Sequence, residues 1–173
     1  MDKDTALELA EGRRSELLHL LSELISTPSP YGSSAAEAQQ VVARYIQPQG
    51  FSVELSTDDP ESYKDHPEFT WPLPPGKEAP VNLVARPHHL MAAPLALYAH
   101  VDTEDPSQDW HSNPMEPLVR DGRMYGLGTA DDKGGLAAML VAAAALSQAT
   151  GEAPLVISMH GKGGGARGTL PVL

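Results

Sequence analysis

The stretch from residue 95 to residue 159 most constrains the fold, because a strongly helix-forming segment lies between two short apolar runs. The helical segment is GGLAAMLVAAAALSQ at 134–148, rich in alanine and leucine, which have high helix propensity. The runs beside it, LALYAH at 95–100 and PLVISM at 154–159, have the length and composition of strands. Helices that alternate with apolar strands predict a layered α/β domain. Because the run at 95–100 is almost entirely apolar, we expect it in the centre of a sheet covered on both faces.

The remaining segments extend the same prediction. Apolar residues at helical spacing predict an amphipathic helix over about residues 5–26. Ser34 and Glu37 fit a capping box that opens a second helix, which ends near Pro48. Strands are predicted for FSVEL, VNLVAR and, more briefly, GRMYG, at 51–55, 81–86 and 122–126, with an exposed loop over 57–80. The whole pattern predicts an α/β fold with a mixed, mostly parallel sheet and helices on both faces. No helix is predicted after 154–159, so we expect that strand to have an uncovered face and the fold to be truncated.

Composition excludes several classes of partner and site. The 173-residue chain has the size of one domain, and 12 Lys and Arg against 23 Asp and Glu give a net charge of −11. An acidic surface repels phosphate backbones, which argues against nucleic acid and anionic membranes. There is no cysteine, so disulfides and thiolate metal ligands are excluded. No segment resembles a signal peptide or a membrane span, which predicts a cytoplasmic protein.

Two clusters of proton-active side chains stand at the ends of predicted elements. The strand at 95–100 ends in His100, followed by Val101 and Asp102, and the glycine-rich stretch before the long helix contains Asp131 and Asp132. Each cluster has a purely structural alternative. A histidine can be buried with one hydrogen bond. Aspartates at a helix start can cap its free N–H groups.

Taken together, the two clusters favour a metal site. Strand side chains alternate, so His100 and Asp102 project to the same side. An aspartate beside a histidine orients the imidazole of a metal ligand. Both clusters lie at the edge where open α/β sheets bind ligands. A histidine nitrogen and carboxylate oxygens, without sulfur, suit zinc in a hydrolytic site.

The two motifs resemble a known family. LYAHVDT, followed by DGRMYGLGTADDKGG at 121–135, is similar to acetylornithine deacetylase, succinyl-diaminopimelate desuccinylase, aminoacylase, carboxypeptidase G and carnosinase. These are zinc hydrolases with two co-catalytic metal ions, and cobalt or manganese can stand in for zinc. The resemblance implies that His100 ligates one zinc ion, that Asp131 bridges both ions and that Asp102 orients His100. It also implies a cis peptide bond between Asp131 and Asp132.

The sequence departs from the family at two places. Relatives carry arginine in the Gly-Arg-Gly before the aspartate, whereas this chain has Leu127 between two glycines. Relatives have two glutamates after the next strand, one of them the general base, whereas the only carboxylate after Asp132 here is Glu152, before that strand. The segment that follows, HGKGGGARG at 160–168, does not fit a phosphate-binding loop, and a flexible turn is favoured. His160 is the one other histidine for which we expect a polar role near the site.

These observations lead to a functional expectation with one alternative. We expect residues 1–173 to be the N-terminal portion of a metallohydrolase catalytic domain, without the lid and dimerisation domain and without the C-terminal half. The resemblance implies an amide-bond hydrolase acting on a small peptide or an N-acyl amino acid, homodimeric in complete relatives. The chain alone, which lacks a general base, is expected to be inactive. The alternative is a non-enzymatic remnant that binds metal weakly or not at all.

Overall fold

The computed structural model describes residues 3–57, 59–67, 69, 78–88, 93, 95–161 and 168–172. Its elements, in chain order, are α1 (Lys3–Gly12), α2 (Arg14–Ser26), α3 (Ala36–Ile46), η1 (Gln47–Gln49), β1 (Phe51–Thr57), η2 (Pro60–Tyr63), β2 (Val81–Pro87), β3 (Ala96–His100), β4 (Leu118–Arg120), β5 (Arg123–Tyr125), α4 (Lys133–Thr150), β6 (Leu155–Met159) and α5 (Thr169–Val172). The predicted turn at 162–167 lies outside the described residues. None of the described helices has both the length and the hydrophobicity to cross a membrane.

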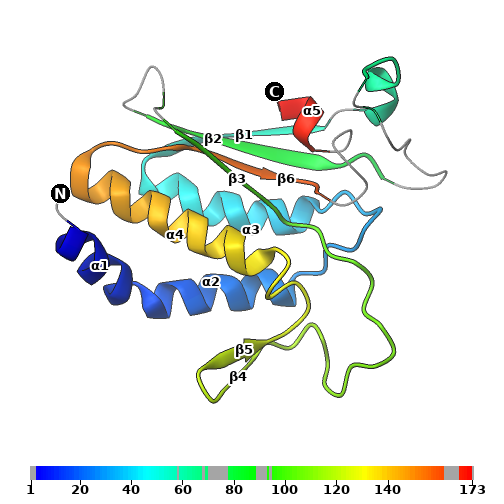
Figure 1. Ribbon diagram of the computed structural model, residues 1–173. Helices are drawn as coiled ribbons and strands as arrows, with labels where there is room; N and C mark the ends of the chain where they lie inside the picture. The colour runs from blue at the N-terminus through cyan, green and yellow to red at the C-terminus, as the bar shows by residue number, and fades with distance from the viewer. Residues whose placement is uncertain are drawn as a thin grey trace.

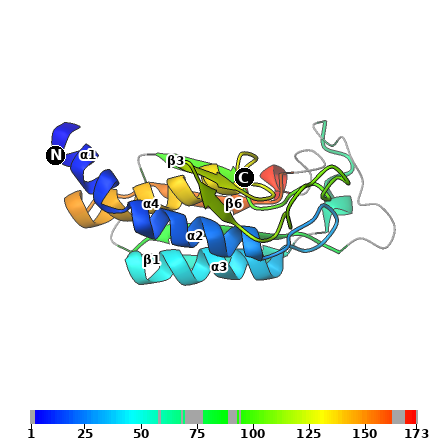
Figure 2. The same cartoon turned by 90° about the horizontal axis from the view of Figure 1, so that it is seen from below.

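The sheet is mixed, and helices pack against it, as predicted. Its strand order is β1-β2-β6-β3, and a separate hairpin, β4-β5, projects from the helix side (Figure 1). Helices α3 and α4 pack against one face of the sheet, and α2 packs against α3 and α4, in front of the other helices in the view from below (Figure 2). Their buried leucines, isoleucines, valines and alanines form the main core with the facing strand residues. Burial of such side chains stabilises the folded state by about 25 cal/mol for each Å² of apolar surface removed from water.

The proportion of parallel pairs is lower than predicted. Among the described strands of the four-stranded sheet, β3 and β6 pair in parallel, whereas β1 with β2 and β2 with β6 are antiparallel. The reason lies in the connections. A parallel pair needs a long crossover, which α4 provides between β3 and β6. Among the described residues between β1 and β2 the one helical element is the short η2, and these two strands pair antiparallel along their full length.

The central position predicted for the strand at 95–100 is wrong within the described sheet. Among the described strands, β3 is an edge strand that pairs only with β6, and the Tyr98 side chain is 72% exposed. The last strand, β6, lies between β2 and β3 and is largely buried. Its second face is not left uncovered, because Val172 of α5 packs against Val84, Ile157 and Met159. An apolar run shows that a strand is shielded from water, but it does not show which strands are its neighbours.

Two helix predictions also change. The helix expected over 5–26 is interrupted at Arg13, between α1 and α2, directly after Gly12, whose helix propensity is low. The capping box of Ser34 and Glu37 is not formed. Helix α3 begins after Ala35, which has φ = 54°, and no side chain caps it. The Ser34 backbone instead pairs with the start of β2, where its carbonyl accepts from Val81 N at 2.8 Å. This tertiary pairing replaces the local cap.

Candidate active site

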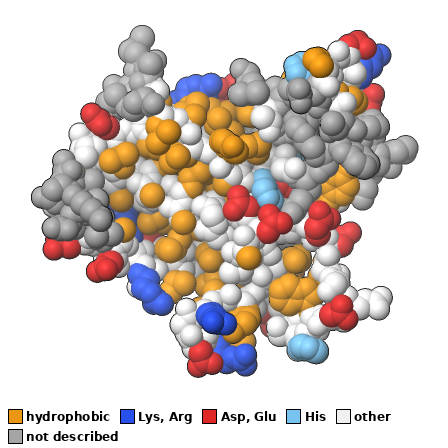
Figure 3. Space-filling view, in the orientation of Figure 1, with side chains coloured by type: hydrophobic (Ala, Val, Ile, Leu, Met, Phe, Trp, Pro, Cys, Tyr) orange, Lys and Arg blue, Asp and Glu red, His pale blue; other side chains and the backbone are white. Residues whose placement is uncertain are grey.

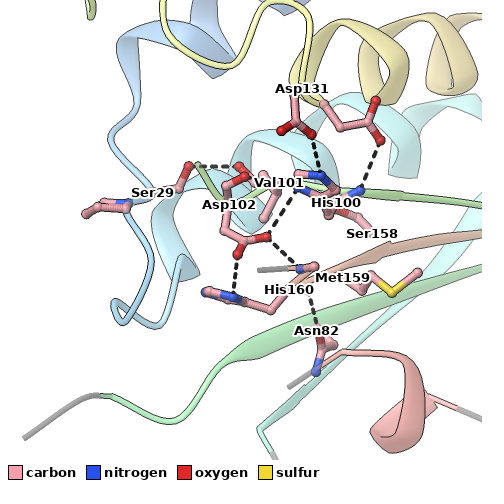
Figure 4. Close-up of polar contacts among 12 residues, drawn as sticks. Ser29, Asn82, His100, Val101, Asp102, Asp131, Ser158, Met159 and His160 are labelled. Carbon is pink, nitrogen blue, oxygen red and sulfur yellow. Dashed lines mark hydrogen bonds and ion pairs between the residues drawn. The ribbon is translucent and has the colours of Figure 1, made fainter. Parts of the chain in front are cut away.

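The predicted site residues come together at the carboxyl ends of two parallel strands. His100 is the last residue of β3, and His160 directly follows β6 (Figure 4). Asp131 lies just before the first turn of α4, the helix that connects these strands. The β3–α4–β6 crossover therefore delivers a histidine, an aspartate and a second histidine to one edge of the sheet.

His100 is held between two aspartates. Its Nε2 atom lies 2.9 Å from Oδ1 of Asp131, and its Nδ1 atom lies 3.0 Å from the main-chain oxygen and 3.4 Å from Oδ1 of Asp102. Hydrogen bonding to Asp102 raises the pKa of His100, and burial opposes that shift. Nδ1 is thus engaged on the inner side, and Nε2 faces a carboxylate whose side chain is 66% exposed.

Asp102 is fully buried, and its carboxylate accepts from three donors. Oδ1 accepts from Gly161 N at 2.6 Å, and Oδ2 lies 2.8 Å from Nδ1 of His160. Burial acts to raise the pKa of Asp102, but the hydrogen bonds from His100, His160 and Gly161 outweigh it and hold that pKa well below its usual range. The predicted orienting role of Asp102 is consistent with this geometry, since an ionised carboxylate lies directly behind the ring of His100.

His160 supports Asp102 from below the site. It is fully buried, its Nε2 atom lies 3.0 Å from the carbonyl oxygen of Ser33, and its backbone N–H donates to Asn82 Oδ1 at 2.9 Å. From the sequence we expected only a polar role near the site. The ring in fact connects Asp102 with the loop before α3, and no sequence spacing between residues 33, 102 and 160 indicates this connection.

Gly161 is needed because the chain passes directly under His100. A Cβ atom at this position would lie 2.6 Å from both Cβ and Cγ of His100, closer than side chains tolerate. The same residue donates its N–H to Asp102. Gly161 therefore allows the end of β6 to approach the histidine and its aspartate at once. From the sequence, this glycine is predicted only as part of a turn.

The start of α4 is held by Lys133 rather than by a capping aspartate. Lys133 is buried, and its ammonium group donates to the carbonyl oxygens of Leu24 at 2.7 Å and Thr27 at 2.9 Å. Burial lowers its pKa to about 8. Asp132 is at the N-cap position, but its side chain makes no cap hydrogen bond and instead accepts from His100 N at 3.4 Å. The Asp132 side chain therefore does not cap α4, which was the structural alternative for this cluster.

The cis peptide bond implied by the family resemblance is present, next to a tight helix entry. The peptide bond between Asp131 and Asp132 is cis. The glycines after Lys133 form a tight helix entry, since a Cβ atom on Gly134 would lie 2.2 Å from the carbonyl oxygen of Thr129. This entry brings the backbone before Asp131 close to the first turn of α4.

The candidate ligand atoms at this site are of the types that bind zinc, but there are few of them. Imidazole nitrogen and carboxylate oxygen are usual zinc ligands, and Nε2 of His100 and Oδ1 of Asp131 face the same point. No group of three or more histidine, aspartate or glutamate side chains suited to a metal occurs within the described part of the chain. Glu152 precedes β6 and so stands at the other end of that strand from the site. The described residues therefore provide two candidate ligands, whereas a closed zinc site has four.

Comparison with known proteins agrees with the two motifs. Residues 96–162 match the family model described as Peptidase family M20/M25/M40. A succinyl-diaminopimelate desuccinylase of Albidiferax ferrireducens is 33% identical over 125 residues, which are 72% of this chain and 30% of that protein. An N-formyl-4-amino-5-aminomethyl-2-methylpyrimidine deformylase of Bacillus subtilis is 28% identical over 167 residues, which are 92% of this chain and 36% of that protein.

Solved structures show the same fold. Human carnosine dipeptidase 1 superposes with a TM-score of 0.62 at 18% identity, over 90% of this chain and 34% of that one. A tripeptidase of Staphylococcus aureus gives a TM-score of 0.59 at 22% identity, over 91% of this chain and 40% of that one. The chain thus spans about a third of the length of these relatives. Residues 96–162 carry the sequence pattern of Peptidase family M20/M25/M40, and the chain is related to the hydrolases of that family.

Proposed function

We propose that this chain carries one part of the metal site of a zinc-dependent hydrolase of amide bonds, a dipeptidase, carboxypeptidase or N-acyl-amino-acid deacylase. The observation that supports this most directly is the contact of His100 Nε2 with Asp131 Oδ1, 2.9 Å apart at a solvent-accessible point. Behind it, the ionised carboxylate of Asp102 orients the imidazole. The relationship to desuccinylases and deformylases supports the same class of reaction.

Each residue has a distinct role in this proposal. His100 and Asp131 would hold zinc, and Asp102 would keep Nε2 of His100 free for the metal by engaging Nδ1. Zinc bound there would act as a Lewis acid toward the scissile carbonyl. A small peptide or an N-acyl amino acid is the proposed substrate. The general base has no counterpart among these residues, because no carboxylate follows β6 in the sequence.

The same observation supports the alternative, a chain that binds a single metal ion weakly and catalyses nothing. Two ligands leave a four-coordinate ion incomplete. This alternative shares the metal-binding residues with the main proposal, so a zinc titration tests what the two have in common.

Zinc titration by calorimetry provides the test. We expect weak binding by the parent chain and no measurable binding by His100→Ala or Asp131→Ala. Asp102→Asn, which removes the charge behind His100, should weaken zinc binding by about 10-fold or more. Asp105→Asn makes the same charge change at an exposed position of the following loop and should bind like the parent. His66→Ala is the histidine control. Equal zinc affinity in all five variants would refute the assignment.

A further inference from the structure

A hollow of about 400 Å³ lies directly beside Asp131. Its walls come from the segment after β3, from β5 and from the glycine-rich stretch before α4, with Trp110, Met124, Tyr125 and Leu127 as its large apolar residues. Ligand sites of enzymes are typically about 300–1,000 Å³, mostly apolar, with few polar groups. Because Asp131 itself forms part of the wall, whatever occupies the hollow also lies next to the candidate metal ligands.

The apolar wall is formed by side chains that are held in place and partly open to solvent. Trp110 is 36% exposed and Tyr125 is 38% exposed. The guanidinium carbon of Arg120 lies 5.4 Å from the centre of the Tyr125 ring, on the side of a neighbouring hollow that shares both aromatic residues. Met124, on the other side of the hairpin, packs against the main core. Figure 3 shows hydrophobic side chains on this part of the surface close to acidic ones. The wall thus offers aromatic surface without being buried in the protein.

The charged residues that line the hollow are all acidic, and the Arg120 cation lies outside its lining. Glu104 and Asp131 contribute carboxylates, and none of the lining residues is lysine or arginine. The chain as a whole has a net charge of −11. A ligand group that carries a carboxylate would therefore be repelled here, whereas an uncharged apolar group would cover the aromatic wall.

We propose that this hollow receives an uncharged aliphatic or aromatic group attached to the scissile amide, and that Leu127 sets this preference over groups that end in a carboxylate. The inference rests on the proposed function, because it places the amide at His100 and Asp131. It adds a substrate class, since it excludes a succinyl-like group from this position. Leu127 lines the hollow without hydrogen-bonding or charged atoms, whereas an arginine there would add a cation beside Glu104 and Asp131.

The test measures binding of three small amides to the 173-residue chain, with and without zinc. N-hexanoylglycine has an aliphatic chain on the carbonyl side of the amide, and N-acetylnorleucine has one on the nitrogen side. N-succinylglycine carries a second carboxylate, at the end of its acyl chain. The reporter is the indole N–H signal of Trp110 in nitrogen–proton NMR spectra, assigned with Trp110→Phe. We expect at least one of the two aliphatic probes to bind at least five-fold more tightly than N-succinylglycine.

Three variants separate the hollow from general charge effects. Leu127→Arg should reduce the preference for the aliphatic probe at least five-fold. Glu104→Gln, at an exposed position, should reduce it in the same direction without changing a packed side chain. Val119→Arg adds the same charge as Leu127→Arg on an exposed residue of β4 that does not line the hollow, and it should leave the preference unchanged.

The outcomes distinguish this inference from the proposed function. Equal binding of all three probes, or equal effects of Leu127→Arg and Val119→Arg, would overturn the specificity inference even if zinc binds at His100. Conversely, selective binding of an aliphatic probe would support the hollow as a ligand site. If zinc affinity were at the same time unchanged in His100→Ala, the proposed metal site, and with it the hydrolase proposal, would be refuted.

Discussion

At the scale of single residues, the pair of Asp102 and His160 has the largest structural consequence. Both side chains are fully buried, and the 2.8 Å contact between Oδ2 and Nδ1 joins the ends of β3 and β6. An ionised carboxylate inside a protein is tolerated only with hydrogen-bonding partners. His160 supplies one of the three donors that hold Asp102. The orientation of His100 therefore depends also on His160, which acts through Asp102 and is not one of the proposed metal ligands.

We predict that His160→Ala lowers the free energy of unfolding by about 3–5 kcal/mol, because it leaves the Asp102 carboxylate buried with one partner fewer. Chemical denaturation followed by circular dichroism measures this change. His19→Ala, on the exposed side of α2, should change stability by less than about 0.5 kcal/mol. Similar stabilities for the two variants would show that His160 is not a required partner of Asp102.

At the scale of elements, Lys133 fastens α4 to α2. Its ammonium group takes the place of a helix cap for α2, since Leu24 and Thr27 lie at the carboxyl end of that helix, where carbonyl oxygens lack partners. Lys133 is itself the first residue of α4, so this single side chain fixes the distance between the two helices next to Asp131. The contact is buried, and burial of a cation has an energetic cost that depends on pH.

We predict that the stability of the folded chain rises between pH 8 and pH 10.5. The unfolded chain retains the Lys133 proton up to the ordinary pKa of 10.5, whereas the folded chain releases it near a pKa of about 8. Between these values the unfolded state binds more protons, so stability increases with pH, by up to about 3 kcal/mol for this group. Denaturation curves at several pH values measure the slope.

Two variants isolate the contribution of Lys133. Lys133→Met removes the titrating group and should lack the additional rise, although it also leaves two carbonyl oxygens without their donor. Lys64→Met changes an exposed lysine at the end of η2 and should retain the slope of the parent chain. An unchanged slope in Lys133→Met would contradict the assignment.

For the molecule as a whole, a well-packed α/β layer carries few candidate metal ligands among the described residues. The β3–α4–β6 unit presents His100, Asp102 and Asp131 together. The described sheet leaves β3 at its edge, with Tyr98 largely exposed. The chain spans about a third of the length of the relatives that it matches.

We predict that the isolated 173-residue chain, loaded with zinc or cobalt, shows no turnover of N-acetyl amino acids or dipeptides above that of buffer. Loss of a general base reduces a rate by about 10²- to 10⁴-fold, and a metal site short of ligands reduces it further. Product release followed by chromatography measures the rate. Turnover that co-elutes with the chain in gel filtration and disappears in His100→Ala would show that another group acts as the base.

The kinds of elements and the candidate ligands follow from local sequence. Helical periodicity, apolar runs and the residues at strand ends are local properties, so the α/β fold and the meeting of His100, Asp102 and Asp131 could be predicted. The family resemblance added the cis peptide bond at Asp131.

The arrangement of these elements depends on tertiary contacts. Strand order and direction depend on pairing between distant segments, and so β3 is at the edge of the described sheet and two of its three strand pairs are antiparallel. The same holds for side chains that meet through the fold. His160 reaches Asp102, and Lys133 reaches the end of α2, across sequence separations that carry no local pattern. Local sequence records whether a residue prefers to be buried, whereas its partner in the interior is selected by packing and by the need to satisfy buried polar groups.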